Sequence, residues 1–334
     1  MEEFIMIMPR PGLDPELGEL LADLPLASRL DPDRLAQLRQ LSVTPVEPYL
    51  KGRAIERREV AVNAPDGAKI PLSIFTAAES RSVSCVYWIH GGGMIMGDRF
   101  SNIDIPLEWL EELGTVVVTV DYRLAPEATR VTPVEDCYQG LRWIVEHADD
   151  LGIDPGRIIV AGASAGGGLA AGLTLLARDR GAPFVAGQVL ICPMLDHRNI
   201  TVSSHQYAGD PGVWTREMNE FGWRSLLGAP AGQDVPVYCS PALAEDLSGL
   251  PTTYIDVGSA EVFRDEDVAY ATGIWAAGGQ AELHVWAGGC HGFDALHPRA
   301  RISATARRTR TDWLARILNP VPGRGFEHSA GAVR

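Results

Sequence analysis

Residues 158–172 read Ile158-Ile-Val-Ala-Gly-Ala-Ser164-Ala-Gly-Gly-Gly-Leu-Ala-Ala-Gly172. The apolar run 158–161 predicts a buried strand, and the residues from Leu169 onward predict a helix. Between them, Gly162-Ala-Ser-Ala-Gly166 matches the G-x-S-x-G pattern. A strand–turn–helix setting for this pattern is typical of a sharp turn that exposes a nucleophilic serine. The alternative is a glycine-rich helix start with an incidental serine, and the setting argues against it.

The flanking sequence predicts an α/β fold with a mostly parallel sheet. Residues 56–62 and 69–75 are rich in β-forming residues and are joined by turn residues, which predicts a hairpin. Short apolar runs then alternate with helical patterns, as in parallel strands joined by right-handed crossovers. The predicted strands are 85–89, 116–120, 158–161, 189–192, 253–257 and 282–286. The predicted helices include 134–148, 169–180, 267–277 and 302–318.

The ends of the chain and one long insertion lie outside this alternation. Residues 1–50 carry apolar side chains at helical spacing around Leu35, Leu38 and Leu41, which predicts short helices before the first strand. No clear strand occurs between Pro193 and Pro251. We expect an insertion of about 195–250 to fold over the strand ends and to form a helical cap with residues 1–50. The catalytic domain would then comprise 51–318, and residues 319–334 are expected to be a mobile tail.

A glycine-rich loop follows the predicted strand 85–89. It reads His90-Gly-Gly-Gly93, and such a loop at a strand end can direct backbone N–H groups toward one point. Those groups can hold the oxyanion of a tetrahedral intermediate, together with the N–H of Ala165 next to the serine. A phosphate-binding loop is the rival interpretation, and it is disfavoured because no Gly-Lys-Ser/Thr follows. A simple tight turn is the other alternative.

A serine alcohol needs a base beside it, and in a fold of this type the base comes late in the chain. His291 lies in Gly288-Gly-Cys-His-Gly-Phe293, just past the last predicted strand, where a base can reach the serine. His284 lies within a strand pattern and is expected to be packed. The remaining histidines between Ser164 and the tail are His197, His205 and His297.

The acid is expected to follow the strand before the histidine. Glu261 stands just after the predicted strand 253–257, where it could accept from the His291 ring and select its tautomer. Asp265 and Glu266 are rivals, but they precede the predicted helix and suit its N-terminal dipole. Asp256, within the strand, is the third candidate.

Taken together, these motifs resemble the hormone-sensitive-lipase family of bacterial esterases. Besides the serine turn and the glycine loop, the matching segments are Asp121-Tyr-Arg-Leu-Ala-Pro-Glu127, Pro133-x-x-Asp136, Gly258-Ser-Ala-Glu-Val-Phe-Arg-Asp-Glu266 and His291-Gly-Phe293. The resemblance covers roughly residues 50 to 318. Segments 151–155 and 164–172 are further similar to bacterial heroin-esterase-like enzymes.

The resemblance implies an α/β-hydrolase fold, an N-terminal cap and a preference for short acyl chains. By the family's pattern, the oxyanion donors would be Gly92, Gly93 and Ala165. Three positions depart from the pattern: Ala163 stands where Asp or Thr is usual, Glu261 where most members have Asp, and Met94 where an aromatic residue is common.

Net charge, the length of apolar runs and cysteine spacing limit which partners and cofactors the sequence predicts. The formal net charge of −14 disfavours nucleic acid and anionic membranes. No apolar run approaches the roughly 18 residues of a membrane span. Five cysteines without CxxC spacing predict neither a disulfide framework nor a zinc site, and Cys85 and Cys192 lie in apolar runs typical of buried thiols. We therefore expect a cytoplasmic protein without cofactor or metal, and a homodimer is left open.

The predicted function is hydrolysis of small carboxylic esters, with short acyl chains, through Ser164, His291 and Glu261 and an acyl-enzyme. An amidase or lactamase using the same residues is the chemical alternative. A non-catalytic receptor for small ligands is the alternative of another class.

Overall fold

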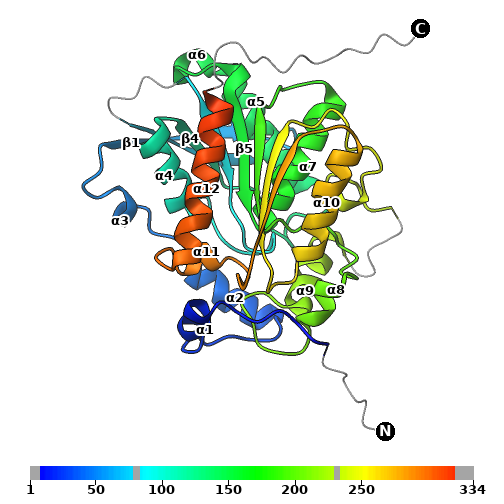
Figure 1. Ribbon diagram of the computed structural model, residues 1–334. Helices are drawn as coiled ribbons and strands as arrows, with labels where there is room; N and C mark the ends of the chain where they lie inside the picture. The colour runs from blue at the N-terminus through cyan, green and yellow to red at the C-terminus, as the bar shows by residue number, and fades with distance from the viewer. Residues whose placement is uncertain (1–7, 78–82, 229–233, 320–334) are drawn as a thin grey trace.

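The computed structural model describes residues 8–77, 83–228 and 234–319, which build helices around a central eight-stranded sheet (Figure 1). The strand order is β1-β2-β4-β3-β5-β6-β7-β8. The strands are β1 (Ile55–Asn63), β2 (Lys69–Ala77), β3 (Cys85–Ile89), β4 (Val116–Val120), β5 (Ile158–Ala163), β6 (Gly187–Ile191), β7 (Thr252–Gly258) and β8 (Ala281–Trp286). β1 and β2 form the predicted hairpin, β2 pairs antiparallel with β4, and the other neighbours are parallel. The predicted mostly parallel sheet is confirmed.

Helices cover both faces of the sheet, which is why its central strands are apolar throughout. In β3, Tyr87 and Ile89 face one core while Val86 and Trp88 face the other. The first core lies under α5 (Thr132–Glu146), α7 (Ala165–Arg180) and α10 (Arg264–Ala276). The second lies under α4 (Asp104–Leu113) and α12 (Arg301–Leu318).

The N-terminal helices α1 (Pro15–Leu21) and α2 (Pro32–Leu41) lie beyond one end of the sheet, together with α8 (Val202–Gln206) and α9 (Arg216–Leu227) of the insertion between β6 and β7 (Figure 1, bottom). The short helix α3 (Glu47–Leu50) lies apart from them at the side of the sheet, and the insertion also carries the 3-10 turn η2 (Pro241–Leu243). Hydrogen bonds join the two segments: for example, Gly212 N–H donates to Ala27 O at 3.1 Å, and Thr215 Oγ1 donates to Ser28 O at 2.6 Å. Short elements elsewhere are α6 (Ala148–Leu151), η1 (Pro155–Arg157) and α11 (Phe293–Leu296).

Several predicted boundaries are wrong by a few residues. α7 begins at Ala165 rather than at Leu169, because its first-turn glycines pack closely against the sheet. α10 begins at Arg264, so Asp265 lies inside the helix and does not precede it. β6 ends at Ile191. The sequence pattern does not single out α4. Residues 320–334 of the predicted tail lie outside the described part.

Among the described residues, no helix is both long enough and apolar enough to cross a membrane.

Candidate active site

Ser164 lies at the tip of a sharp turn between β5 and α7. Its φ of 55° falls in the left-handed region, which a residue with a side chain rarely adopts. The turn also needs the neighbouring glycines: a Cβ on Gly162 would lie 2.3 Å from Gly166 O, and one on Gly166 would lie 2.1 Å from Ile89 O. The Ser164 N–H donates to Ile191 O at 2.8 Å, which attaches the turn to the end of β6. This is the geometry that presents a serine nucleophile above a sheet.

The structure brings Ser164, His291 and Glu261 into one hydrogen-bonded line. His291 Nε2 lies 2.9 Å from Ser164 Oγ, and His291 Nδ1 lies 2.7 Å from Glu261 Oε2. Glu261 and His291 are both buried. A carboxylate at Nδ1 holds a proton there and leaves Nε2 free to accept the serine proton. The arrangement can therefore raise the nucleophilicity of the serine.

The rival acids are engaged elsewhere. Asp265 accepts from Ser203 N–H at 2.7 Å and pairs with Arg264 at 2.7 Å. Asp256 pairs with Arg310 at 2.8 Å. Their contacts stabilise neighbouring segments and do not reach His291.

Glu266 departs from its predicted role as a helix-dipole acid. Its carboxylate is buried, and it accepts from the N–H groups of Leu195 at 2.7 Å and of Asp196 at 3.1 Å. Burial raises its pKa well above the usual range, although the two amides oppose the rise. Glu266 thus anchors the start of the insertion after β6.

His284 and His197 make their contacts away from the serine. His284 lies in β8, stacks between Tyr254 and Trp286, and contacts Glu282 at 3.1 Å, in line with the expectation that it is packed. His197 Nδ1 lies 3.0 Å from Ser240 Oγ.

The glycine loop after β3 lies against the serine turn. A Cβ on Gly91 would lie 3.3 Å from Ser164 Cβ, so the loop and the nucleophile are in close contact. Gly92 and Gly93 both have positive φ, at 108° and 62°, and a Cβ on Gly92 would lie 2.1 Å from Met96 O. Ala165 is the first residue of α7, so its N–H has no intrahelical acceptor. Gly92 and Gly93 line the same cavity as Ser164, and Ala165 follows the serine directly in the chain.

A cavity of about 380 Å³ opens above Ser164. Its lining includes Leu24, Leu30 and Leu38 from the N-terminal segment and Trp214 from the insertion. The Trp214 ring lies so close to Gly93 that a Cβ there would lie 2.4 Å from it. The sequence pattern placed Trp214 in the insertion but did not predict that it forms a wall of the cavity, since that contact joins residues far apart in the chain.

One group of donor side chains in the described part of the chain lies close enough to hold a metal. The donor atoms of Cys192, Glu261 and His291 lie within 4.8 Å of one another. Both His291 nitrogens already contact other side chains, and burial, followed by nearby carboxylates, raises the pKa of the Cys192 thiol well above its usual range. This chemistry suits an acid–base relay better than a metal centre.

Comparison with known proteins identifies the family. A family model described as the alpha/beta hydrolase fold matches residues 86–295. The chain belongs to the α/β-hydrolase family. This α/β-hydrolase is 33% identical to esterase LipI of Mycobacterium tuberculosis over 281 residues, which cover 82% of this chain and 86% of the relative. It is 34% identical to carboxylesterase NlhH of the same species over 313 residues, or 89% and 94% of the two chains.

Among solved structures, a bacterial heroin esterase superimposes on this α/β-hydrolase with a TM-score of 0.84 at 37% identity, covering 92% of this chain and 98% of the other. These findings confirm the resemblance to the hormone-sensitive-lipase family of esterases and the prediction of a serine carboxylesterase.

Proposed function

We propose that this α/β-hydrolase cleaves short-chain carboxylic esters through a Ser164–His291–Glu261 triad and an acyl-enzyme. The observation that carries the proposal is the continuous hydrogen-bonded line from Ser164 Oγ through His291 to Glu261. The left-handed Ser164 and the adjacent amides supply the other two parts that acyl transfer needs, an exposed nucleophile and an oxyanion site.

In acylation, His291 Nε2 takes the proton of Ser164 Oγ as the oxygen attacks the ester carbonyl. The negative charge that develops on the carbonyl oxygen is met by the N–H groups of Gly92, Gly93 and Ala165. Glu261 stabilises the imidazolium, whose proton then passes to the leaving alkoxide and releases the alcohol. Ser164 is left as an acyl ester.

In deacylation, His291 removes a proton from a water molecule that attacks the acyl carbonyl. The same amides hold the second oxyanion, and the proton on His291 returns to Ser164 as the acid departs. His291 acts as base and then as acid in each half of the cycle.

The cavity supports a role for residues 1–50 and the insertion as a cap. Its lining is largely apolar, and Leu30, Leu38 and Trp214 bring side chains from both segments over Ser164. A cavity of about 380 Å³ lies at the small end of the range for ligand pockets, which favours a small ester.

The experiment pairs Ser164→Ala with a panel of p-nitrophenyl esters and matching anilides of graded chain length. The unaltered enzyme should react with a fluorophosphonate probe and prefer short esters. Ser164→Ala should fold, lose the label and lose roughly 10³- to 10⁶-fold in turnover. The proposal fails if the variant keeps a tenth of the activity, and anilides cleaved faster than esters would favour an amidase. A folded wild-type protein inert to both probe and panel would indicate a receptor.

A further inference from the structure

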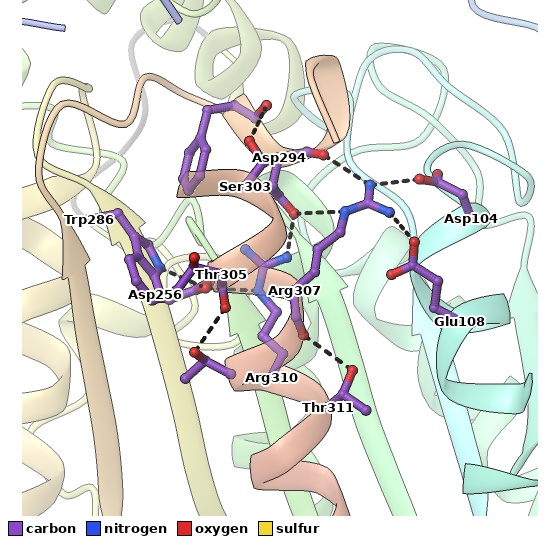
Figure 2. A network of polar contacts seen from close by, with 12 residues as sticks. Asp104, Glu108, Asp256, Trp286, Asp294, Ser303, Thr305, Arg307, Arg310 and Thr311 are labelled. Atoms are coloured by element: carbon purple, nitrogen blue, oxygen red, sulfur yellow. Dashed lines mark hydrogen bonds and ion pairs between the residues drawn. The ribbon is translucent and has the colours of Figure 1, made fainter. Parts of the chain in front are cut away.

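A buried network of charged side chains lies between α12 and the sheet (Figure 2). Arg310 is at its centre: Nε donates to Asp256 Oδ2 at 2.8 Å, and Nη1 donates to Asp294 Oδ2. The side chains of Arg310, Asp256 and Asp294 are 1%, 1% and 2% exposed. Such burial makes the contacts both strong and directional.

The two carboxylates that Arg310 joins belong to the segments that deliver the proposed acid and base. Asp256 lies in β7, five residues before Glu261. Asp294 lies in α11, three residues after His291. Arg310 therefore fixes these two backbone segments relative to one another, although it contacts neither triad side chain.

Backbone hydrogen bonds extend the link to the serine turn. Asp256 O accepts from Cys192 N–H at 2.7 Å, and Ile191 O accepts from Ser164 N–H at 2.8 Å. The side chain of Asp256 also accepts from Trp286 Nε1 at 3.1 Å, at the end of the strand that leads into the His291 loop. All three triad segments are thus attached to Asp256, through its backbone carbonyl or through the carboxylate that Arg310 holds.

A second arginine holds Asp294 from the other side. Arg307, one turn earlier on α12, donates to the Asp294 carbonyl at 3.0 Å and pairs with Asp104 and Glu108 of α4 at 2.6 Å each (Figure 2). Although burial opposes ionisation, Arg310 and then Arg307 hold the pKa of Asp294 below its usual range. The Asp294 carboxylate is therefore committed to the network, even though the residue lines the cavity.

Stability alone does not account for this arrangement. Burying charges costs desolvation free energy that ion pairing often only offsets, and apolar side chains of similar size frequently do as well. What a rigid guanidinium adds is a fixed distance and orientation between two carboxylates. Errors of about 1 Å in the placement of catalytic groups can cost on the order of 100-fold in rate.

We propose that Arg310 is a positioning residue of the hydrolase, which sets the Glu261 segment and the His291 loop in register through Asp256 and Asp294. The proposal rests on the proposed triad function. The contacts of Arg310 are present before substrate binds, and they do not touch the substrate. We therefore expect them to affect turnover more than substrate affinity.

The test compares Arg310→Lys with Arg316→Gln, a control on the same helix whose guanidinium makes an exposed pair with Glu282. An ammonium can hold one carboxylate but lacks the planar fork that spans two. We expect Arg310→Lys to lower kcat roughly 10- to 100-fold with KM within about threefold, and to shift the acid limb of the kcat/KM pH profile. Arg316→Gln should match the unaltered enzyme in all three.

Asp294→Asn makes the test independent of the folding of the arginine variant. It keeps the shape of the side chain and leaves Arg310 paired with Asp256 and Arg307 paired with Asp104 and Glu108. Measured well below its Tm, this variant should also have a lower kcat and a shifted acid limb of the kcat/KM pH profile. If either Arg310→Lys or Asp294→Asn folds and keeps the wild-type kcat and pH profile, the positioning role is overturned, whatever its Tm. Fluorophosphonate labelling of Ser164 in the same samples separates this outcome from a failure of the triad itself.

Discussion

Two regions around the Ser164 site are held by different kinds of contact. We call the buried network of Arg310, Asp256 and Asp294 the floor, and the cavity-lining parts of residues 1–50 and of the insertion the roof. In the floor, Arg310 joins two buried carboxylates with short, directed hydrogen bonds. In the roof, the cavity is walled by apolar side chains such as Leu30, Leu38 and Trp214. Ionic contacts in a low-dielectric interior restrict both distance and angle, whereas apolar contacts depend mainly on the area covered. The floor therefore restricts the relative positions of the segments that it joins more strictly than the roof does.

Arg39 connects the N-terminal part of the roof to the segment that follows the glycine loop. Arg39 of α2 donates from Nε to Ile95 O and from Nη2 to Ala125 O, both at 2.7 Å, and pairs with Glu127. Ile95 follows the glycine loop closely. The N-terminal segment therefore holds the chain next to the glycine loop and also contributes side chains to the wall of the cavity.

The largest effect is expected at the proposed acid, Glu261, whose segment the floor holds. Glu261→Gln keeps the size of the side chain but removes the charge that stabilises the imidazolium, so kcat should fall by about 10³- to 10⁴-fold. The Tm should change little. Glu261→Asp should retain intermediate activity, since the charge stays but the reach shortens. Steady-state kinetics and thermal melts measure both.

Asp265→Asn is the matched control for the charge. Asp265 holds Ser203 and Arg264, so its loss should cost on the order of 1 kcal/mol of stability with near-normal turnover. If a folded Asp265→Asn variant lost turnover while Glu261→Gln stayed active, the assignment of Glu261 as the acid would be wrong.

A smaller effect is expected from the roof. Deleting residues 1–40 removes α1, most of α2 and the Arg39 contacts. It should lower kcat/KM by roughly 10- to 100-fold, alter the chain-length profile and reduce solubility, because apolar surface above Ser164 becomes exposed. Arg39→Gln should lower kcat/KM by less, with the chain-length profile kept. An unchanged profile in a soluble truncated enzyme would contradict the cap.

The smallest expected effect is on stability, and it concerns Asp267, a buried acid that lacks the ion pairs of the acids in the floor. Asp267 is fully buried, and neither carboxylate oxygen has a hydrogen-bond partner among the described residues. Burial, and then the nearby Glu261, raises its pKa well above the usual range. The unfolded chain therefore loses this proton at lower pH than the folded protein, so stability falls as pH rises above about 4.

Asp267→Asn should remove that penalty. We expect a Tm higher by a few degrees at pH 8 and a gain that fades as the pH is lowered toward 4, with turnover retained. Asp312→Asn, at an exposed position on α12, serves as the control and should change the Tm little at either pH. A Tm gain for Asp267→Asn that is equal at both pH values would show that ionisation is not its cause.

Local patterns were sufficient for the sheet. The bounds of β3 and β4 match the predicted segments, because a short run buried on both faces is apolar throughout and ends at turn residues. The serine turn and the histidine loop are also local, since their spacing from a strand end is visible in the chain. The start of α10 was misplaced because Asp265 and Glu266 are polar, and only their tertiary partners make them part of the helix.

By itself the sequence determined the α/β architecture, the turn that exposes Ser164 and the short set of acids and histidines near it. Only the tertiary structure decided which acid lies against His291, that Trp214 walls the cavity, and that Arg310 joins Asp256 to Asp294. These contacts link residues separated by 16 positions, for Asp294 and Arg310, to 121 positions, for Gly93 and Trp214. The physical reason is that a strand or turn follows from the residues within it, whereas the partner of a buried charge depends on how distant segments pack.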